Sequence, residues 1–220
     1  MVIAASTFTR ESYAQSGRPV EKVRVVPYGA PEPVARDIAL ARAKLLRDSL
    51  LRFIWAGTFG VRKGAHYVIE AWRNGDFGRF ATLDVFGSVG LPKDVMNGAL
   101  RGLTIHGPIG HEQLMLEVQD ADALLFPTLC DGFGMVATEA WSRGTPVITT
   151  DRAGVVAMLR HRENGLLIES GSSAAIVEAL QWCLEHPAEL RHMREASLDT
   201  AARWQWSDYR RAIVAASIDR

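Results

Sequence analysis

Two acids and two glycines lie close together in the stretch DGFGMVATE, a few residues after the apolar run ALLFP. Asp131 precedes Gly132 and Gly134, and Glu139 follows Asp131 by eight positions. Glycine permits tight backbone geometry and the close approach of a ligand. If a helix begins at about 133–135, its unpaired amides form a seat for anionic oxygen. Carboxylates hold vicinal hydroxyls through charge-assisted hydrogen bonds, so the pattern suits a ligand with hydroxyls at both ends and phosphate in the middle, the layout of a nucleotide sugar.

A second candidate for phosphate contact is the basic pair Arg62 and Lys63, in the loop between the apolar run LRFIWAG and the helical segment AHYVIEAW. Phosphate at this rim would meet these cations on one side and the 132–135 amides on the other. Both signals have plainer interpretations: the basic pair as solvated loop cations, Asp131 as a partner of the helix dipole, and Glu139 on a solvated face. The chain has neither a Walker A phosphate loop here nor a GxGxxG dinucleotide fingerprint after a strand.

The overall charge argues against a large polyanionic partner. The chain has 220 residues, with 25 basic and 25 acidic side chains and a formal net charge of zero. This balance disfavours nucleic acid or an anionic membrane as partner. Two cysteines are too few for a disulfide framework, no apolar run is as long as a membrane span, and the first residues do not resemble a secretory signal. We therefore expect a cytoplasmic protein.

The elements that must position these residues alternate between strand and helix. Apolar runs of strand length are followed, in most cases, by segments with helical periodicity. Continuous apolar runs indicate strands buried on both faces, so we predict an α/β protein with a Rossmann-like open parallel sheet and helices on both faces, followed by a helical C-terminal tail from Ser173. Ligands bind such sheets beyond the carboxyl ends of the strands, which points to the loops after Ala56, Phe86, Ile105 and Phe126. The runs lie at 2–6, 23–27, 51–57, 81–87, 103–107, 123–128, 146–150 and 165–169.

The domain division follows from the turn signals. Residues 1–20 contain one strand and one helix, too little to fold alone, and the sequence opens abruptly inside an apolar strand, as a remnant of a preceding domain would. Residues 21–220 form the main domain, whose sheet we expect to run from about Val23 to about Ile168. The first strand, VIAAS, then has no sheet to join within the chain. An unpaired apolar edge favours pairing with a second copy of the chain.

Three ordered motifs resemble a known family. GTFGVRKGAHYVIEAW, ADALLFPTLCDGFGMVATEAWSRGTPVITTDRAG and ENGLLIESGSSAAIVEAL are similar to the signatures of retaining GT-B glycosyltransferases of family GT4, the group 1 glycosyltransferases. The likeness covers nearly the whole chain and matches the C-terminal, donor-binding domain. It implies a two-domain enzyme that transfers a hexose from a nucleotide-sugar donor with retention and without a metal or other cofactor. The acceptor-binding domain then lies outside this chain, which is expected to transfer nothing alone.

The resemblance also implies roles for individual residues. Asp131 would contact the transferred hexose, Glu139 the ribose hydroxyls and Lys63 the diphosphate, with Asp131 and Lys63 as the catalytic pair. The base would touch the backbone between Thr104 and His106. The implied donor-binding set is Gly57, Thr58, Arg62, Lys63, Ile105, His106, Asp131, Gly132, Phe133, Gly134, Met135, Val136 and Glu139.

Two positions depart from the family's pattern. The first acid is Asp131 where the family has Glu, and the shorter side chain loosens the contact with the hexose. Thr58 stands where the family has an Arg directly after the strand's glycine, which removes a cation from the diphosphate site. Arg62 is the nearest candidate to replace it.

Other interpretations stay open beside this one. The chain could be a non-catalytic nucleotide-sugar-binding module, or half of a related sugar-nucleotide epimerase. Asp120 and Asp122 form a DxD, the metal-binding signature of another glycosyltransferase class, but they precede the run ALLFP and so fall at the wrong end of the sheet. The base and sugar of the donor and the identity of the acceptor leave no legible signature.

Overall fold

A six-stranded parallel sheet forms the centre of the computed structural model, which describes residues 2–45, 50–98 and 100–218. The strands lie in the order β10-β9-β8-β3-β5-β7, and every pair is parallel. This confirms the predicted fold class. The strands are β3 (Leu51–Ala56), β5 (Ala81–Phe86), β7 (Leu103–Gly107), β8 (Ala123–Phe126), β9 (Val147–Thr150) and β10 (Gly165–Ile168).

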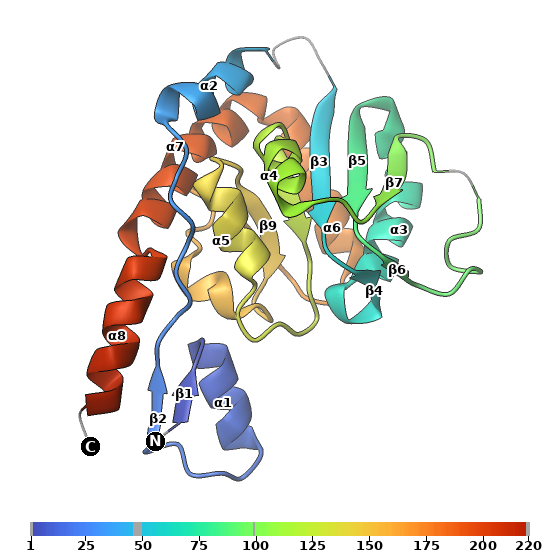
Figure 1. The fold of residues 1–220 in the computed structure, drawn as a ribbon. Helices are drawn as coiled ribbons and strands as arrows, with labels where there is room; N and C mark the ends of the chain where they lie inside the picture. The colour runs from blue at the N-terminus through green and yellow to red at the C-terminus, as the bar shows by residue number, and fades with distance from the viewer. Residues whose placement is uncertain (1, 46–49, 99, 219–220) are drawn as a thin grey trace.

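The apolar runs form central strands because both faces of the sheet are covered. In β3, Phe53 and Trp55 belong to one apolar cluster, whereas Ile54 belongs to the other, as the alternation of side chains along a strand requires. The first cluster lies under α3 (Ala65–Asn74) and α6 (Ser173–Glu185). The second lies under α4 (His111–Gln119) and α5 (Met135–Ser142), on the opposite face (Figure 1).

Buried polar groups join the layers by hydrogen bonds. In α7 (Pro187–Arg203), the fully buried guanidinium of Arg194 donates to the carbonyl oxygens of Ala39, Gln119 and Ala121, at 3.1, 2.7 and 2.8 Å. These bonds connect α7 to the end of α4 and to α2 (Arg36–Leu45). Carbonyl partners of this kind offset the cost of burying a charge.

The N-terminal strand has a partner within the chain, contrary to our expectation. β1 (Val2–Ala4) pairs in parallel with β2 (Val23–Val25), and α1 (Thr7–Gln15) connects them. The six-stranded sheet therefore begins at Leu51, and the expectation that it begins near Val23 is wrong. A parallel pair needs a crossover, which α1 supplies, so the first residues complete a small strand–helix–strand unit beside the main sheet (Figure 1). We call residues 2–25 the N-terminal unit.

The helical tail is present as predicted, with α8 (Trp206–Ile218) as its last helix. Trp204 donates from Nε1 to the carbonyl oxygen of Pro27 at 2.9 Å, and Tyr28 stacks on Trp206 at 6.0 Å between ring centroids. These contacts hold the segment after β2 against the C-terminal helix. Within the described ranges, none of the helices combines the length and apolar character that crossing a membrane requires.

Two short strands extend the loops at the carboxyl edge of the main sheet. β4 (Phe59–Gly60) pairs in parallel with β6 (Val89–Gly90), just after β3 and β5 respectively. The 3-10 turn Val61–Lys63 follows β4 directly and leads into α3. The predicted basic pair thus sits on a short, hydrogen-bonded extension of the sheet.

Candidate functional site

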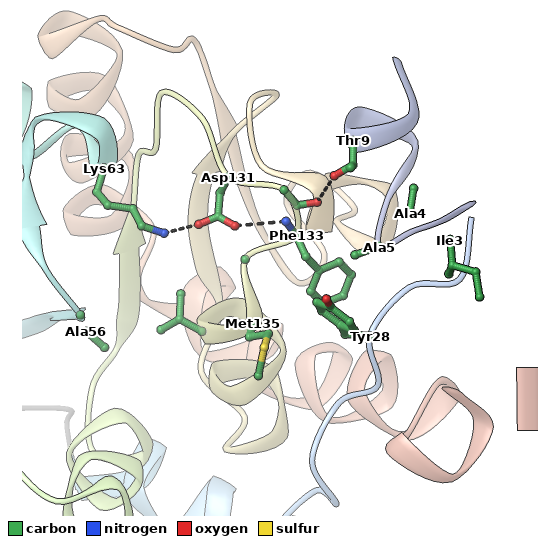
Figure 2. Close-up of a pocket in the computed structure, with 14 residues that line it drawn as sticks. Ile3, Ala4, Ala5, Thr9, Tyr28, Ala56, Lys63, Asp131, Phe133 and Met135 are labelled. Atoms are coloured by element: carbon green, nitrogen blue, oxygen red, sulfur yellow. Dashed lines mark hydrogen bonds and ion pairs between the residues drawn. The ribbon is translucent and has the colours of Figure 1, made fainter. Parts of the chain in front are cut away.

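A cavity of about 630 Å³ lies at the carboxyl ends of β3 and β8, where the sheet topology predicts a ligand site. Its walls come from the loops after those strands, from the start of α5 and from the N-terminal unit with the segment that follows it (Figure 2). The lining residues are Ile3, Ala4, Ala5, Thr9, Tyr28, Ala56, Gly57, Lys63, Asp131, Gly132, Phe133, Gly134, Met135 and Val136.

Helix α5 begins at Met135, as predicted, and turns its N-terminus to the cavity. Gly134 is the N-cap, with a left-handed φ of 94° and no side-chain cap. A Cβ atom at this position would lie 2.8 Å from Cε1 of Phe126, so only glycine fits the turn without strain. With no side chain capping them, the first amides of α5 are available to an anionic ligand.

Lys63 and Asp131 meet in the cavity, which confirms that the two loops share one rim. The Lys63 ammonium is paired with Oδ2 of Asp131, and Oδ1 accepts a hydrogen bond from the Phe133 amide at 3.1 Å (Figure 2). The side chains are 21% and 17% exposed. Nζ of Lys63 also lies 4.7 Å from the centroid of the Phe126 ring, in a cation–π contact.

Backbone contacts hold these two loops together. The carbonyl oxygen of Arg62 accepts from the Leu129 amide at 3.0 Å and from the Thr128 hydroxyl at 3.3 Å. Gly64 has a φ of 81°, and a Cβ atom there would lie 2.1 Å from the carbonyl oxygen of Pro127. Close approach of the two backbones therefore requires glycine at position 64 and brings Lys63 within reach of Asp131.

Arg62, the proposed substitute for the missing arginine, lies outside the cavity lining but beside Asp131. Its side chain is 65% exposed and Nη1 donates to the carbonyl oxygen of Cys130 at 2.8 Å. The distance from Nη1 to Oδ2 of Asp131 is 3.9 Å. Thr58 is exposed and lies outside the lining, and its hydroxyl accepts from Ser88 at 3.4 Å.

The predicted base-binding residues Ile105 and His106 also lie outside the cavity lining. The His106 ring stacks on Phe86 at 4.5 Å, and Nε2 lies 2.7 Å from Oδ1 of Asp84. Burial raises the pKa of Asp84, but hydrogen bonds from His106 and Arg52 outweigh it, so the net pKa is lowered. The imidazole is therefore held against Phe86 and Asp84, and the predicted contact of a base with the backbone between Thr104 and His106 stays a prediction.

Glu139 lies on α5, half-buried and outside the cavity lining. Burial, which disfavours the charged form, raises the pKa of this carboxyl, and the nearby His111 opposes the shift. The predicted pocket therefore unites Lys63, Asp131 and the first turn of α5, and the second carboxylate lies apart from it. Contact between Glu139 and a ribose stays a prediction.

Six lining residues were not in the predicted set: Ala56, the last residue of β3, and five from the first 28 residues. Those five are Ile3, Ala4, Ala5, Thr9 and Tyr28. Tyr28 packs edge-on against Phe133 with ring centroids 5.3 Å apart. The aromatic type of Tyr28 and the hydroxyl of Thr9 are the only local signals, and neither differs from that of an ordinary surface residue. Their role depends on how the N-terminal unit folds back against the loop after β8.

The DxD acids lie at the opposite end of β8 from the cavity, as predicted from their order in the chain. Asp120 is the C-cap of α4, and Asp122 is buried directly before β8. Oδ2 of Asp122 accepts from the Arg52 amide at 2.8 Å. Asp122 is thus engaged in fixing the start of strand β3.

An open parallel sheet with a cavity at the carboxyl ends of its strands, lined by an ion pair and by the amides of a helix N-terminus, is typical of doubly wound α/β folds. Comparison of the sequence makes the assignment specific. The profile of the family described as glycosyl transferases group 1 matches residues 38–199, and the chain belongs to that family.

Individual relatives support this assignment. The chain is 31% identical over 117 residues to the D-inositol 3-phosphate glycosyltransferase of Corynebacterium urealyticum, covering 53% of this chain and 28% of that protein. It is 26% identical over 182 residues to the D-rhamnosyltransferase WbpZ of Pseudomonas aeruginosa, covering 79% and 47%. The chain therefore spans less than half the length of these curated relatives.

Solved structures share the fold. The crystal structure of Alr3699/HepE from Anabaena, a complex with UDP and glucose, superposes with a TM-score of 0.80 at 20% sequence identity. The match covers 100% of this chain and 63% of that one.

Proposed function

We propose that this chain is the nucleotide-sugar-binding domain of a retaining, metal-independent glycosyltransferase of family GT4 that transfers a hexose to an acceptor. The observation that carries the proposal is the cavity in which Lys63, Asp131 and the N-terminus of α5 come together. Membership of the group 1 family and the fold shared with a protein solved with UDP and glucose support it.

The chemistry follows from the charges in the cavity. Sugar transfer leaves a diphosphate whose negative charge grows as the glycosidic bond breaks. In this proposal, Lys63 and the first amides of α5, which line the cavity, neutralise that charge and no metal ion is needed. The ionised carboxylate of Asp131 accepts hydrogen bonds and donates none, which suits it to bind the hydroxyl groups of the hexose.

The acceptor is bound, in this proposal, by a domain that precedes the chain. The chain covers only part of each relative, which is compatible with a separate acceptor-binding domain. We expect the 220-residue chain to bind donor and to transfer no sugar by itself. Sugar transfer by the purified chain with no added partner contradicts this.

A thermal-shift panel of UDP, GDP, ADP and their sugars tests donor binding. A ligand that binds only the folded state stabilises it by about 2.7 kcal/mol at a concentration of 100 Kd. We expect one base to raise the melting temperature most. If none of these ligands raises it, the proposal fails.

Calorimetry with Lys63→Met then assigns the site. Loss of a charged hydrogen bond to phosphate predicts a decrease in affinity of about 10- to 100-fold. Lys93→Met, which removes an exposed lysine outside the cavity lining, is the matched control and should bind normally. Equal affinity of the two variants would show that Lys63 does not contact the phosphate and that the phosphate binds elsewhere.

The finer parts of the proposal need the full-length enzyme. We expect transfer to continue in excess chelator and the product to keep the anomeric configuration of the donor. Product analysis also separates this reaction from epimerisation, which releases an altered sugar and glycosylates no acceptor.

A further inference from the structure

Two hydroxyl groups of the N-terminal unit converge on one carbonyl oxygen of the loop after β8. Ser6 Oγ and Thr9 Oγ1 lie 2.5 and 2.9 Å from the carbonyl oxygen of Gly132. Both residues belong to the N-terminus of α1, where Ser6 is the N-cap and accepts from the Thr9 amide at 3.0 Å. Ser6 is 2% exposed, so its side of this contact is buried between the two parts of the chain, whereas Thr9 is half-buried and Gly132 is exposed.

Ser6 and the Gly132 carbonyl pack closely against Gly154. A Cβ atom at Gly154 would lie 2.4 Å from Ser6 Oγ and 2.3 Å from the Gly132 carbonyl oxygen. The neighbouring carbonyls are held by the backbone, since Asp131 accepts from the Gly154 amide at 3.0 Å and Phe133 from the Val155 amide at 2.6 Å. Of these three consecutive carbonyls, the middle one depends on the N-terminal unit.

The orientation of that carbonyl fixes an amide that faces the cavity. A trans peptide is planar, so the Phe133 N–H points opposite to the Gly132 carbonyl. This N–H donates to Oδ1 of Asp131, whose other oxygen is paired with Lys63 (Figure 2). Gly132 has no side chain to restrict its backbone, and without the two hydroxyls the peptide can rotate.

We propose that Ser6 and Thr9 are positioning residues for donor binding: their hydroxyls hold the Gly132–Phe133 peptide so that its N–H faces Asp131 and the cavity. The inference rests on the proposed function, because it names a determinant of the same site. If Ser6 and Thr9 have this role, donor affinity depends on the packing of the N-terminal unit against the loop after β8. The contacting residues of the two parts lie more than a hundred positions apart in the sequence.

The test compares Thr9→Val with Thr9→Ser. Valine keeps the shape of threonine and removes the hydroxyl, whereas serine keeps the hydroxyl. The probe is whichever of UDP, GDP and ADP stabilises the unsubstituted chain most, measured by calorimetry. We expect Thr9→Val to weaken binding about three- to tenfold and Thr9→Ser to bind within about twofold of the unsubstituted chain. Ser12→Ala, which removes another α1 hydroxyl that bonds within its own helix, should not change binding.

A second measurement reads the peptide itself. In amide NMR spectra of the ligand-free chain, the Phe133 resonance should shift in Thr9→Val and return in Thr9→Ser. Ser6→Ala should add to the loss of affinity, but because Ser6 also caps α1, its helix content is checked by circular dichroism.

The outcomes separate the two proposals. If the unsubstituted chain binds a nucleotide and Thr9→Val binds it equally with the Phe133 resonance unmoved, the inference is overturned and the proposed function stands. If Thr9→Ser loses as much affinity as Thr9→Val, the hydroxyl is not the cause and the inference is also overturned. If the unsubstituted chain binds no nucleotide, the proposed function fails, and an unmoved Phe133 resonance in Thr9→Val would then overturn the orienting role as well.

Discussion

Lys63 and Asp131 form an ion pair in the cavity, so a donor bound as proposed would have to compete with that pair. Both side chains are mostly buried, and separating them without replacement would leave two desolvated charges. A nucleotide sugar offers an exchange, because its phosphate accepts from Lys63 while its hydroxyls donate to Asp131. The shorter acid at position 131 pairs with Lys63, accepts from the Phe133 amide and lies 3.9 Å from Nη1 of Arg62.

Replacing Asp131 by Asn should separate phosphate binding from sugar binding. Asparagine can still accept from the Phe133 amide, but it no longer competes for Lys63. We expect the nucleoside diphosphate to bind at least as tightly as before, while the extra affinity gained from the attached sugar falls about tenfold. Calorimetry with both ligands measures the ratio, and Asp94→Asn, an exposed acid outside the cavity lining, is the control. An equal loss for both ligands would mean that Asp131 only supports the loop.

Glu139 predicts a pH effect on stability. Because its folded-state pKa is raised by burial, this carboxyl favours the folded state in acid, and the contribution is lost as pH rises through the raised pKa. Glu139→Gln should therefore stabilise the chain at neutral pH, by less than about 1 kcal/mol, and the gain should vanish below the ordinary carboxyl pKa. Urea unfolding at both pH values measures it, with the exposed Glu178→Gln as control. A constant difference at both pH values would contradict the ionisation argument.

At the scale of elements, the start of α5 is the part of the site most dependent on one residue. Gly134 has a left-handed backbone conformation and lies against the Phe126 ring. An added methyl group would therefore strain the backbone and overlap with that ring. The same turn directs the first amides of the helix into the cavity. Stability and the proposed donor binding therefore depend on the same turn.

Gly134→Ala should cost about 2–4 kcal/mol of unfolding free energy and abolish donor binding. Gly110→Ala is a matched control, because Gly110 caps α4 with a φ of −62° and has open space around it. We expect that change to be neutral or to stabilise by up to about 1 kcal/mol. Equal stabilities in urea for the two variants would show that the turn at Gly134 relaxes easily.

At the scale of the whole molecule, the N-terminal unit is a wall of the cavity as well as a separate small sheet. β1 pairs with β2 and has no other strand partner in the described parts of the chain. The original reason for expecting a dimer, an unpaired first strand, is therefore wrong. One edge of β1 is still open in this two-stranded sheet, and pairing with a second copy through it stays a prediction.

Val2→Lys tests self-association through that edge. Val2 is 40% exposed at the end of β1, and a lysine on an edge strand opposes pairing with another chain. We expect the mass measured by light scattering to rise with concentration for the unsubstituted chain and to stay monomeric for the variant. A strict monomer in both cases at high concentration would exclude this interface.

What the sequence by itself determined was the local structure and the edge at which the site lies. The apolar runs identified the six core strands, the glycines before Met135 marked the start of a helix, and Lys63 and Asp131 were expected together because parallel strands end at one edge. Only the tertiary structure decided that β1 pairs with β2, that Ser6 and Thr9 hold the Gly132 carbonyl, and that Glu139 lies outside the cavity. The physical reason is the distance along the sequence over which each signal acts. Periodicity and turn residues reflect the burial and backbone conformation of neighbouring residues. Contacts between residues more than a hundred positions apart depend on how the elements pack in the folded chain.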